Sequence, residues 1–116
     1  MNLEEAVNVA RGLMDHHGLT AKGWQFRFHE EVDPLGACWW EGRTITLCQK
    51  FAERCDEEFV IDTLLHEIAH ALAGKRDGHS ARWRAKARKI GCMVLPEEVA
   101  RGFRGCLSCT VTLVKE

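Results

Sequence analysis

The pentad His66-Glu67-Ile68-Ala69-His70 constrains this chain most, because it lies in a segment with the pattern of a long amphipathic helix. Apolar side chains recur there at steps of three and four residues, the spacing of one helix face: Val60, Leu64, Leu65, Ile68 and Leu72. Asp56 suits the N-terminal cap of this helix and Gly74 its C-terminal end. The sequence therefore predicts a helix over residues 56–74 that carries two histidines one turn apart.

The spacing of the two histidines predicts a zinc site. Side chains four residues apart lie on the same face of a helix, so both imidazoles can reach one metal ion. Glu67 projects about 100° around the helix from His66, which places it beside such an ion and not among its ligands. A carboxylate there can accept a proton from water, so we predict that Glu67 is a general base.

The pentad alone lacks one ligand, because catalytic zinc usually has three protein ligands and one open position. We prefer His79 as the third, since it follows a glycine-containing loop that can turn the chain back toward the helix. Glu97 or Glu98, from a later helix, are the alternatives. The metzincin pattern is excluded, because Ala73 and Arg76 stand where it needs glycine and histidine.

The remaining chain predicts one α+β domain. Periodicity predicts an N-terminal helix over 3–17 and a second, basic helix over 80–90, and alternation predicts strands at 24–30, 37–40 and 43–48. We expect a small, mostly antiparallel sheet, then the pentad helix and the basic helix. A chain of 116 residues has room for one core. We therefore expect a single domain, 1–116, in which 96–116 is a short tail with a helical stretch and a small strand.

Charge is distributed unevenly, although the formal net charge is only −1. Residues 1–65 hold 12 acids and 6 bases, whereas residues 75–89 hold seven bases and one acid. Arg82, Lys86 and Lys89 share one face of the basic helix, and such a face can bind the phosphates of DNA. A solvated helix face that binds nothing is the alternative.

Four tryptophans divide between core and surface. Trp24 and Trp83 fit inward positions, whereas Trp39 and Trp40 are neighbours on a strand and should point to opposite faces. At least one of that pair is therefore a candidate for a substrate groove.

The chain shows neither the pattern of a signal peptide nor an apolar run long enough to span a bilayer. We therefore expect a cytoplasmic protein that does not enter a membrane. Six cysteines in such a chain indicate reduced thiols or metal ligands before disulfides. Cys38, Cys48 and Cys55 are predicted to be small buried side chains.

Several motifs together resemble those of the SprT-like metallopeptidases, the group that includes the Spartan DNA–protein crosslink proteases. They are His66-Glu67-x-x-His70, Asp77-Gly78-His79, Trp83, Ala87-Arg88-Lys89-Ile90-Gly91, Trp24-x-Phe26 and Gly42-x-x-Ile45-x-Leu47. The likeness covers most of positions 20–92. It implies a zincin-like fold, zinc bound by His66, His70 and His79, and Glu67 as the catalytic acid/base. In its best-known members it also implies proteolysis of DNA-bound proteins, a DNA-repair activity.

The resemblance raises two further expectations. By analogy with zincins, the strand over 44–47 is a candidate for the sheet edge that pairs with an extended peptide. Many relatives carry a zinc ribbon of two cysteine pairs, but here only Cys106 and Cys109 follow. We expect this pair to be metal-free, and the alternative is a site completed by Cys92, by another side chain or by a second copy of the chain.

We therefore expect a zinc metalloendopeptidase that acts on a protein substrate, with DNA as a second candidate partner. The alternative is a non-catalytic nucleic-acid-binding module in which zinc only braces the fold. Glu67 separates the two, because a structural site needs no carboxylate beside an open coordination position. The chain has no tyrosine, so a metal, a backbone amide or a basic side chain must stabilise the oxyanion. The sequence leaves the oligomeric state open.

Overall fold

The computed structural model describes residues 1–74 and 78–93 of the chain. The fold is α+β, and its elements follow the predicted order. They are α1 (Leu3–His16), η1 (Thr20–Lys22), β1 (Gln25–His29), β2 (Gly36–Trp39), β3 (Thr44–Cys48), α2 (Gln49–Arg54), α3 (Glu57–Ala73) and α4 (Ala81–Lys89). The short helices η1 and α2 were not predicted. The helix and strand predicted in the tail lie outside the described residues.

The sheet is mixed, with the strand order β1-β3-β2. β2 and β3 pair antiparallel, and their tight turn is closed by a hydrogen bond of 3.3 Å from the N–H of Arg43 to the carbonyl of Trp40. β1 pairs with β3 in parallel, so the expectation of a mostly antiparallel sheet is corrected at this pair. β3 lies in the centre, and the prediction that residues 44–47 form a sheet edge is therefore wrong. Within the described residues the edges are β1 and β2.

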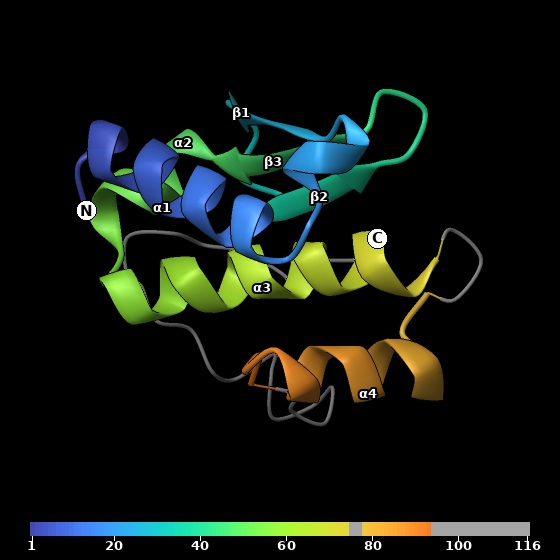
Figure 1. The fold of residues 1–116 in the computed structure, drawn as a ribbon. Coiled ribbons are helices and arrows are strands. Elements are labelled where there is room, and N and C mark those ends of the chain that lie inside the picture. Colours follow the sequence, from blue (N-terminus) through green and yellow to red (C-terminus); the bar gives the residue numbers. More distant parts are fainter. Residues whose placement is uncertain (75–77, 94–116) are drawn as a thin grey trace.

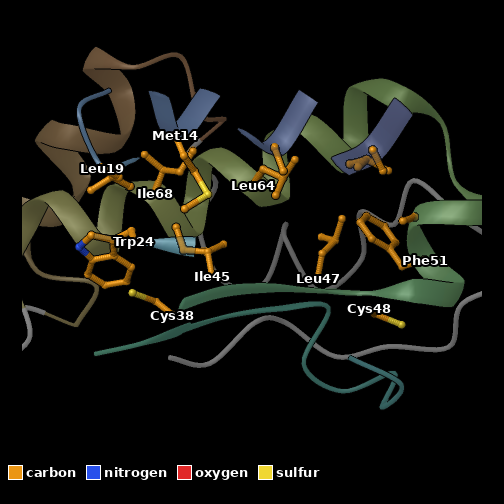
Figure 2. Close-up of a cluster of buried hydrophobic side chains, with 14 of the residues drawn as sticks. Met14, Leu19, Trp24, Cys38, Ile45, Leu47, Cys48, Phe51, Leu64 and Ile68 are labelled. Carbon is orange, nitrogen blue, oxygen red and sulfur yellow. The ribbon is translucent and has the colours of Figure 1, made fainter. Parts of the chain in front are cut away.

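The main core lies between the sheet and the helices α1 and α3. α1 begins with a capping box, in which the side chain of Asn2 accepts the N–H of Glu5, and it buries Ala6, Ala10 and Met14. Figure 2 shows side chains from all these elements meeting in one cluster. It includes Met14, Leu19, Trp24, Ile45, Leu47, Leu64 and Ile68. Burial of these apolar side chains holds α3 against the sheet.

The pentad helix α3 is apolar on two sides. Figure 1 shows α3 lying between α4 on one side and the sheet with α1 on the other. Leu64 and Ile68 belong to the main core, whereas Leu65 and Ala69 pack in a second cluster with Trp83 and other residues around α4. The apolar stripe predicted from the sequence is therefore divided between the two clusters, since Leu64 and Ile68 pack in the first and Leu65 in the second. His66 and His70 both contact Trp83 of the second cluster.

Asp56 occupies the predicted N-cap position of α3, but its side chain makes no capping hydrogen bond. Ser80 caps α4, because its Oγ accepts the N–H of Trp83 at 3.4 Å. Trp24 and Trp83 are buried. Trp39 is 56% exposed, whereas Trp40 packs edge-on against Trp24 with ring centroids 5.2 Å apart. The two neighbouring tryptophans thus point to opposite faces of the sheet.

The three cysteines predicted to be buried are buried. Cys38 and Cys48 are not disulfide-bonded. Cys55 is disulfide-bonded, so the expectation of a reduced thiol is wrong at that residue. Among the residues described, no helix combines the length and the apolar character needed to cross a membrane.

Candidate metal and catalytic centre

Three histidines from two parts of the chain meet beside α3. His66 and His70 lie one turn apart on α3, and His79 lies in the turn that precedes α4. One ring nitrogen from each of them lies within 4.8 Å of the other two. The structure thus brings together the three residues that the sequence predicts as metal ligands.

The spacing of these nitrogens fits a small tetrahedral metal ion. Nε2 of His66 and Nε2 of His79 lie 3.2 Å apart. Zinc–nitrogen bonds of about 2.0–2.1 Å at tetrahedral angles place two ligand nitrogens about 3.4 Å apart. Small shifts of the rings are therefore enough to hold such an ion, and neutral imidazole is the commonest metal ligand in proteins.

The three imidazoles differ in their exposure. His70 is buried, His66 is half-buried and His79 is exposed. The cluster is therefore covered by protein on the side of His70 and open to solvent on the side of His79. A catalytic metal needs such an open side, because substrate or water must reach its remaining coordination position.

Glu67 is fully buried, at 0% exposure, where β2 approaches α3. A Cβ placed on Gly36 would lie 3.1 Å from Cγ of Glu67 and 3.0 Å from Cγ2 of Thr63. A methyl group at this position would force these two side chains to shift by a few tenths of an ångström. Burying an ionisable carboxylate costs free energy, and such groups are concentrated at functional sites.

Gly36 and Thr63 were not predicted from the sequence as neighbours of Glu67. Gly36 is the first residue of β2. Its position at the entry to a strand was the available signal, because glycine in or beside a strand often marks the close approach of another backbone.

Trp83 forms one wall of the histidine cluster, although the sequence predicted only a core residue. Its ring centroid lies 4.7 Å from that of His66, 5.2 Å from that of His70 and 4.7 Å from that of His79. The indole Nε1–H donates a hydrogen bond of 3.3 Å to the carbonyl of His66. Its closeness in sequence to the predicted ligand His79, four residues before it, was the available signal.

Asp62 lies one turn before His66 and anchors the chain that follows α4. Its Oδ1 accepts the N–H of Met93 at 2.6 Å. Burial raises the pKa of Asp62, while the N–H of Met93, the thiol of Cys92 and the charge of His66 oppose this rise. The carboxylate therefore links α3 to the end of the α4 segment beside the histidines.

Cys92 lies in the same region and is a free, buried cysteine. Burial raises the pKa of its thiol far above the ordinary range, and the nearby charges of Asp62 and Glu67 raise it further. The thiol of Cys92 is therefore protonated in the metal-free chain.

The predicted basic face lies on α4, which follows His79 directly. Arg82 and Lys89 are exposed and Lys86 is half-buried, while Trp83 and Ala87 face the second core cluster. The three basic side chains therefore lie on a different face of α4 from its apolar contact with α3. The first of them follows the predicted metal ligand His79 by three residues. The alternative ligands Glu97 and Glu98 and the pair Cys106 and Cys109 lie outside the described residues.

Comparison with known proteins gives a family and a structural neighbour. The sequence profile of the SprT-like family matches residues 9–105. Among solved structures, the metallopeptidase zymogen jannalysin of Methanocaldococcus jannaschii superposes with a TM-score of 0.63 at 14% identity. The match covers 72% of this chain and 79% of that chain, and at this identity it shows a shared fold. No curated protein sequence matches the chain.

Proposed function

The chain belongs to the SprT-like family, and from this membership we propose that it is a zinc-dependent metalloendopeptidase of the His-Glu-x-x-His type. One observation carries the proposal. Donor nitrogens of His66, His70 and His79 converge within 4.8 Å of one another, and the residue that follows His66 in the chain, Glu67, is fully buried. Three imidazoles favour zinc over the hard, oxygen-loving cations magnesium and calcium. Three protein ligands also leave one tetrahedral position for substrate.

In this mechanism the chain's own residues hold the metal and move one proton. Zinc held by His66, His70 and His79 would act as a Lewis acid that makes water more acidic and polarises the scissile carbonyl. Glu67 takes the proton of the attacking water on its carboxylate and donates it to the leaving nitrogen. The buried position of Glu67 keeps bulk water from competing for this carboxylate, which favours directed proton transfer.

The edge strand β2 is the best candidate to align a protein substrate. It is an edge of the described sheet, and its first residue, Gly36, lies against Glu67. An extended peptide that hydrogen-bonds to a free strand edge adds one more strand to the sheet. Such a peptide would run alongside β2, the strand whose first residue approaches Glu67. This role replaces the one that the sequence analysis gave to residues 44–47.

A second candidate activity is DNA binding through α4. The basic residues Arg82, Lys86 and Lys89 recur at helical spacing on an element that starts beside the histidine cluster. DNA bound there would bring associated proteins near the proposed catalytic centre, in keeping with an action on DNA-associated proteins. If hydrolysis is absent, the same observation supports a nucleic-acid-binding module with a structural zinc ion.

The substitution Glu67→Gln tests the proposal, because it removes the proton acceptor and leaves the three imidazoles. The purified wild type should contain about one zinc per histidine cluster and cleave a DNA-binding protein, assayed with and without single-stranded DNA. Glu67→Gln should keep its zinc and lose about a hundredfold or more in rate. Glu58→Gln, an exposed change on the same helix, is the matched control and should keep both properties.

Two outcomes would contradict the proposed mechanism. Loss of zinc from Glu67→Gln would mean that Glu67 helps to hold the metal. Full activity with zinc retained would show that another group accepts the proton. A wild type that binds zinc but hydrolyses nothing, with or without DNA, would favour the nucleic-acid-binding alternative.

A further inference from the structure

We propose that Trp83 is a positioning residue of the metal centre, whose indole holds the three imidazoles in the arrangement that a metal ion needs. This inference rests on the proposed metal site and adds a residue outside its ligand set. The evidence is the contact of one ring with all three histidines, at centroid distances of 4.7 to 5.2 Å. Separations of this size are typical of directly packed aromatic rings.

The contacts differ in geometry, and each restrains a different imidazole. The indole is stacked on His70, with an interplanar angle of 26°. It meets His66 and His79 edge-on, at 61° and 67°. A stacked ring limits tilting of His70, whereas edge contacts limit rotation of the other two. One side chain therefore restricts the orientation of every proposed ligand.

A hydrogen bond sets the position of the indole itself. Nε1–H of Trp83 donates to the carbonyl of His66 at 3.3 Å. In an α-helix this carbonyl accepts the N–H of the residue four positions later, here His70. The indole is thus attached to the helical turn that carries both histidines of α3, and it keeps a constant register with them.

The same contact explains how His79 reaches the cluster. His79 is exposed and lies in the turn before α4, separated from that helix only by Ser80. Trp83 is 5% exposed and is the largest side chain of α4 in the second core cluster. Docking of the indole against α3 therefore delivers His79 to the other two ligands. Metal binding then costs less ordering entropy, as for any preorganised site.

If Trp83 only stabilised the core, its replacement would lower the stability of the chain without changing its metal affinity. Metal titration therefore separates a positioning role from a purely structural one. We compare Trp83→Phe, which removes Nε1–H and one ring, with Trp83→Leu, which keeps an apolar side chain without an aromatic face. Cobalt(II) is the probe, because its absorption reports both affinity and coordination geometry. Removing an outer support of a metal site typically lowers affinity about 10–100-fold. We expect at least a tenfold loss for Trp83→Phe, a larger loss for Trp83→Leu, and an altered cobalt spectrum in both.

Trp40→Phe is the matched control, because Trp40 is a half-buried tryptophan that packs on Trp24 in the main core. It should bind cobalt as the wild type does. The unfolding free energy of each metal-free variant is measured in parallel with a chelator. Wild-type affinity and spectrum in a folded Trp83→Phe would overturn the proposal, even if its metal-free form were less stable.

A second measurement uses the wild type alone, in case both Trp83 variants fail to fold. Zinc should shift the assigned indole N–H resonance of Trp83 and slow its hydrogen exchange, while that of Trp40 stays unchanged. An unaffected Trp83 resonance at saturating zinc would overturn the inference. If the wild type binds neither zinc nor cobalt, the proposed metal site itself fails, which is a distinguishable result.

Discussion

Nε2 of His66 and Nε2 of His79 lie 3.2 Å apart, although 13 positions separate the two residues in the chain. His66 belongs to a central helix that packs on both sides, whereas His79 lies in an exposed turn. The contact therefore depends on how α4 docks against α3. It brings the distant residue His79 to His66 and His70, which are already neighbours on one helix.

His79→Ala tests this contact. Two imidazoles and solvent hold zinc weakly, so we expect severe loss of zinc and no detectable hydrolysis. Metal content after dialysis and a peptidase assay measure both effects. His16→Ala, an exposed histidine at the end of α1, is the control. Zinc retained in His79→Ala but lost in Glu97→Ala or Glu98→Ala would establish the glutamate alternative.

Gly36→Ala should disturb the approach of β2 to α3. The added methyl would lie 3.0 Å from Cγ2 of Thr63, 3.1 Å from Cγ of Glu67 and 3.3 Å from the carbonyl oxygen of Thr46. Overpacking of this kind costs about 1–3 kcal/mol of unfolding free energy. We also expect slower hydrolysis, because the carboxylate of Glu67 must move.

The control for this change is Gly12→Ala on α1, where an added methyl meets nothing within 4 Å. Alanine in a helix is more favourable than glycine by about 0.5–1 kcal/mol. Gly12→Ala should therefore leave hydrolysis unchanged and stability unchanged or higher. Denaturant unfolding and the peptidase assay measure both variants, and equal behaviour of the two would contradict the close approach at Gly36.

The basic face of α4 predicts a steep salt dependence of DNA affinity. Each phosphate contact releases condensed counterions, with a slope of about −0.7 to −0.9 per contact in a plot of log affinity against log salt. Reversing the charge of Arg82, Lys86 and Lys89 to glutamate should flatten the slope by about two to three. The matched control reverses three exposed charges elsewhere: Lys22, Lys50 and Arg54. Equal slopes for the two triple variants would leave α4 a solvated face.

Asp62 predicts a pH-dependent stability. Burial raises its pKa, so the folded chain binds this proton more tightly than the unfolded chain does. Its stabilising contribution is therefore complete below the ordinary aspartate pKa and is lost as pH rises through the raised value. Asp62→Asn does not titrate and keeps an acceptor for the N–H of Met93. We expect the stability of Asp62→Asn relative to the wild type to increase across that pH range.

Asp62→Ala is the companion variant, because it removes both the charge and the acceptor. Loss of the hydrogen bond to Met93, 2.6 Å long, should cost about 0.5–1.5 kcal/mol relative to Asp62→Asn. Both effects are measured by denaturant unfolding of the metal-free proteins at a series of pH values from about 3 upward. A constant difference between wild type and Asp62→Asn at every pH would contradict the raised pKa.

Much of the local structure follows from the sequence alone. The long helix, its histidine pair, the cap at Ser80 and the outward position of Trp39 or Trp40 all depend on residues a few positions apart. Helical and strand periodicities determine which residues a few positions apart share a face, and for this reason the predictions agree with α3, α4 and β2. The same local reasoning missed α2, because six residues are too few for a clear period.

The arrangement of the candidate site was decided only by the tertiary structure. The sequence could name His79 as a third ligand, but its approach to His66 depends on the docking of Trp83. It could not place β3 between β1 and β2, since strand order leaves no mark on the alternation of a single strand. The burial of Glu67 likewise depends on Gly36, 31 positions earlier. Local patterns determined which groups the chain carries, whereas packing between distant elements determined which of them meet, because side-chain contacts form only after the whole core has closed.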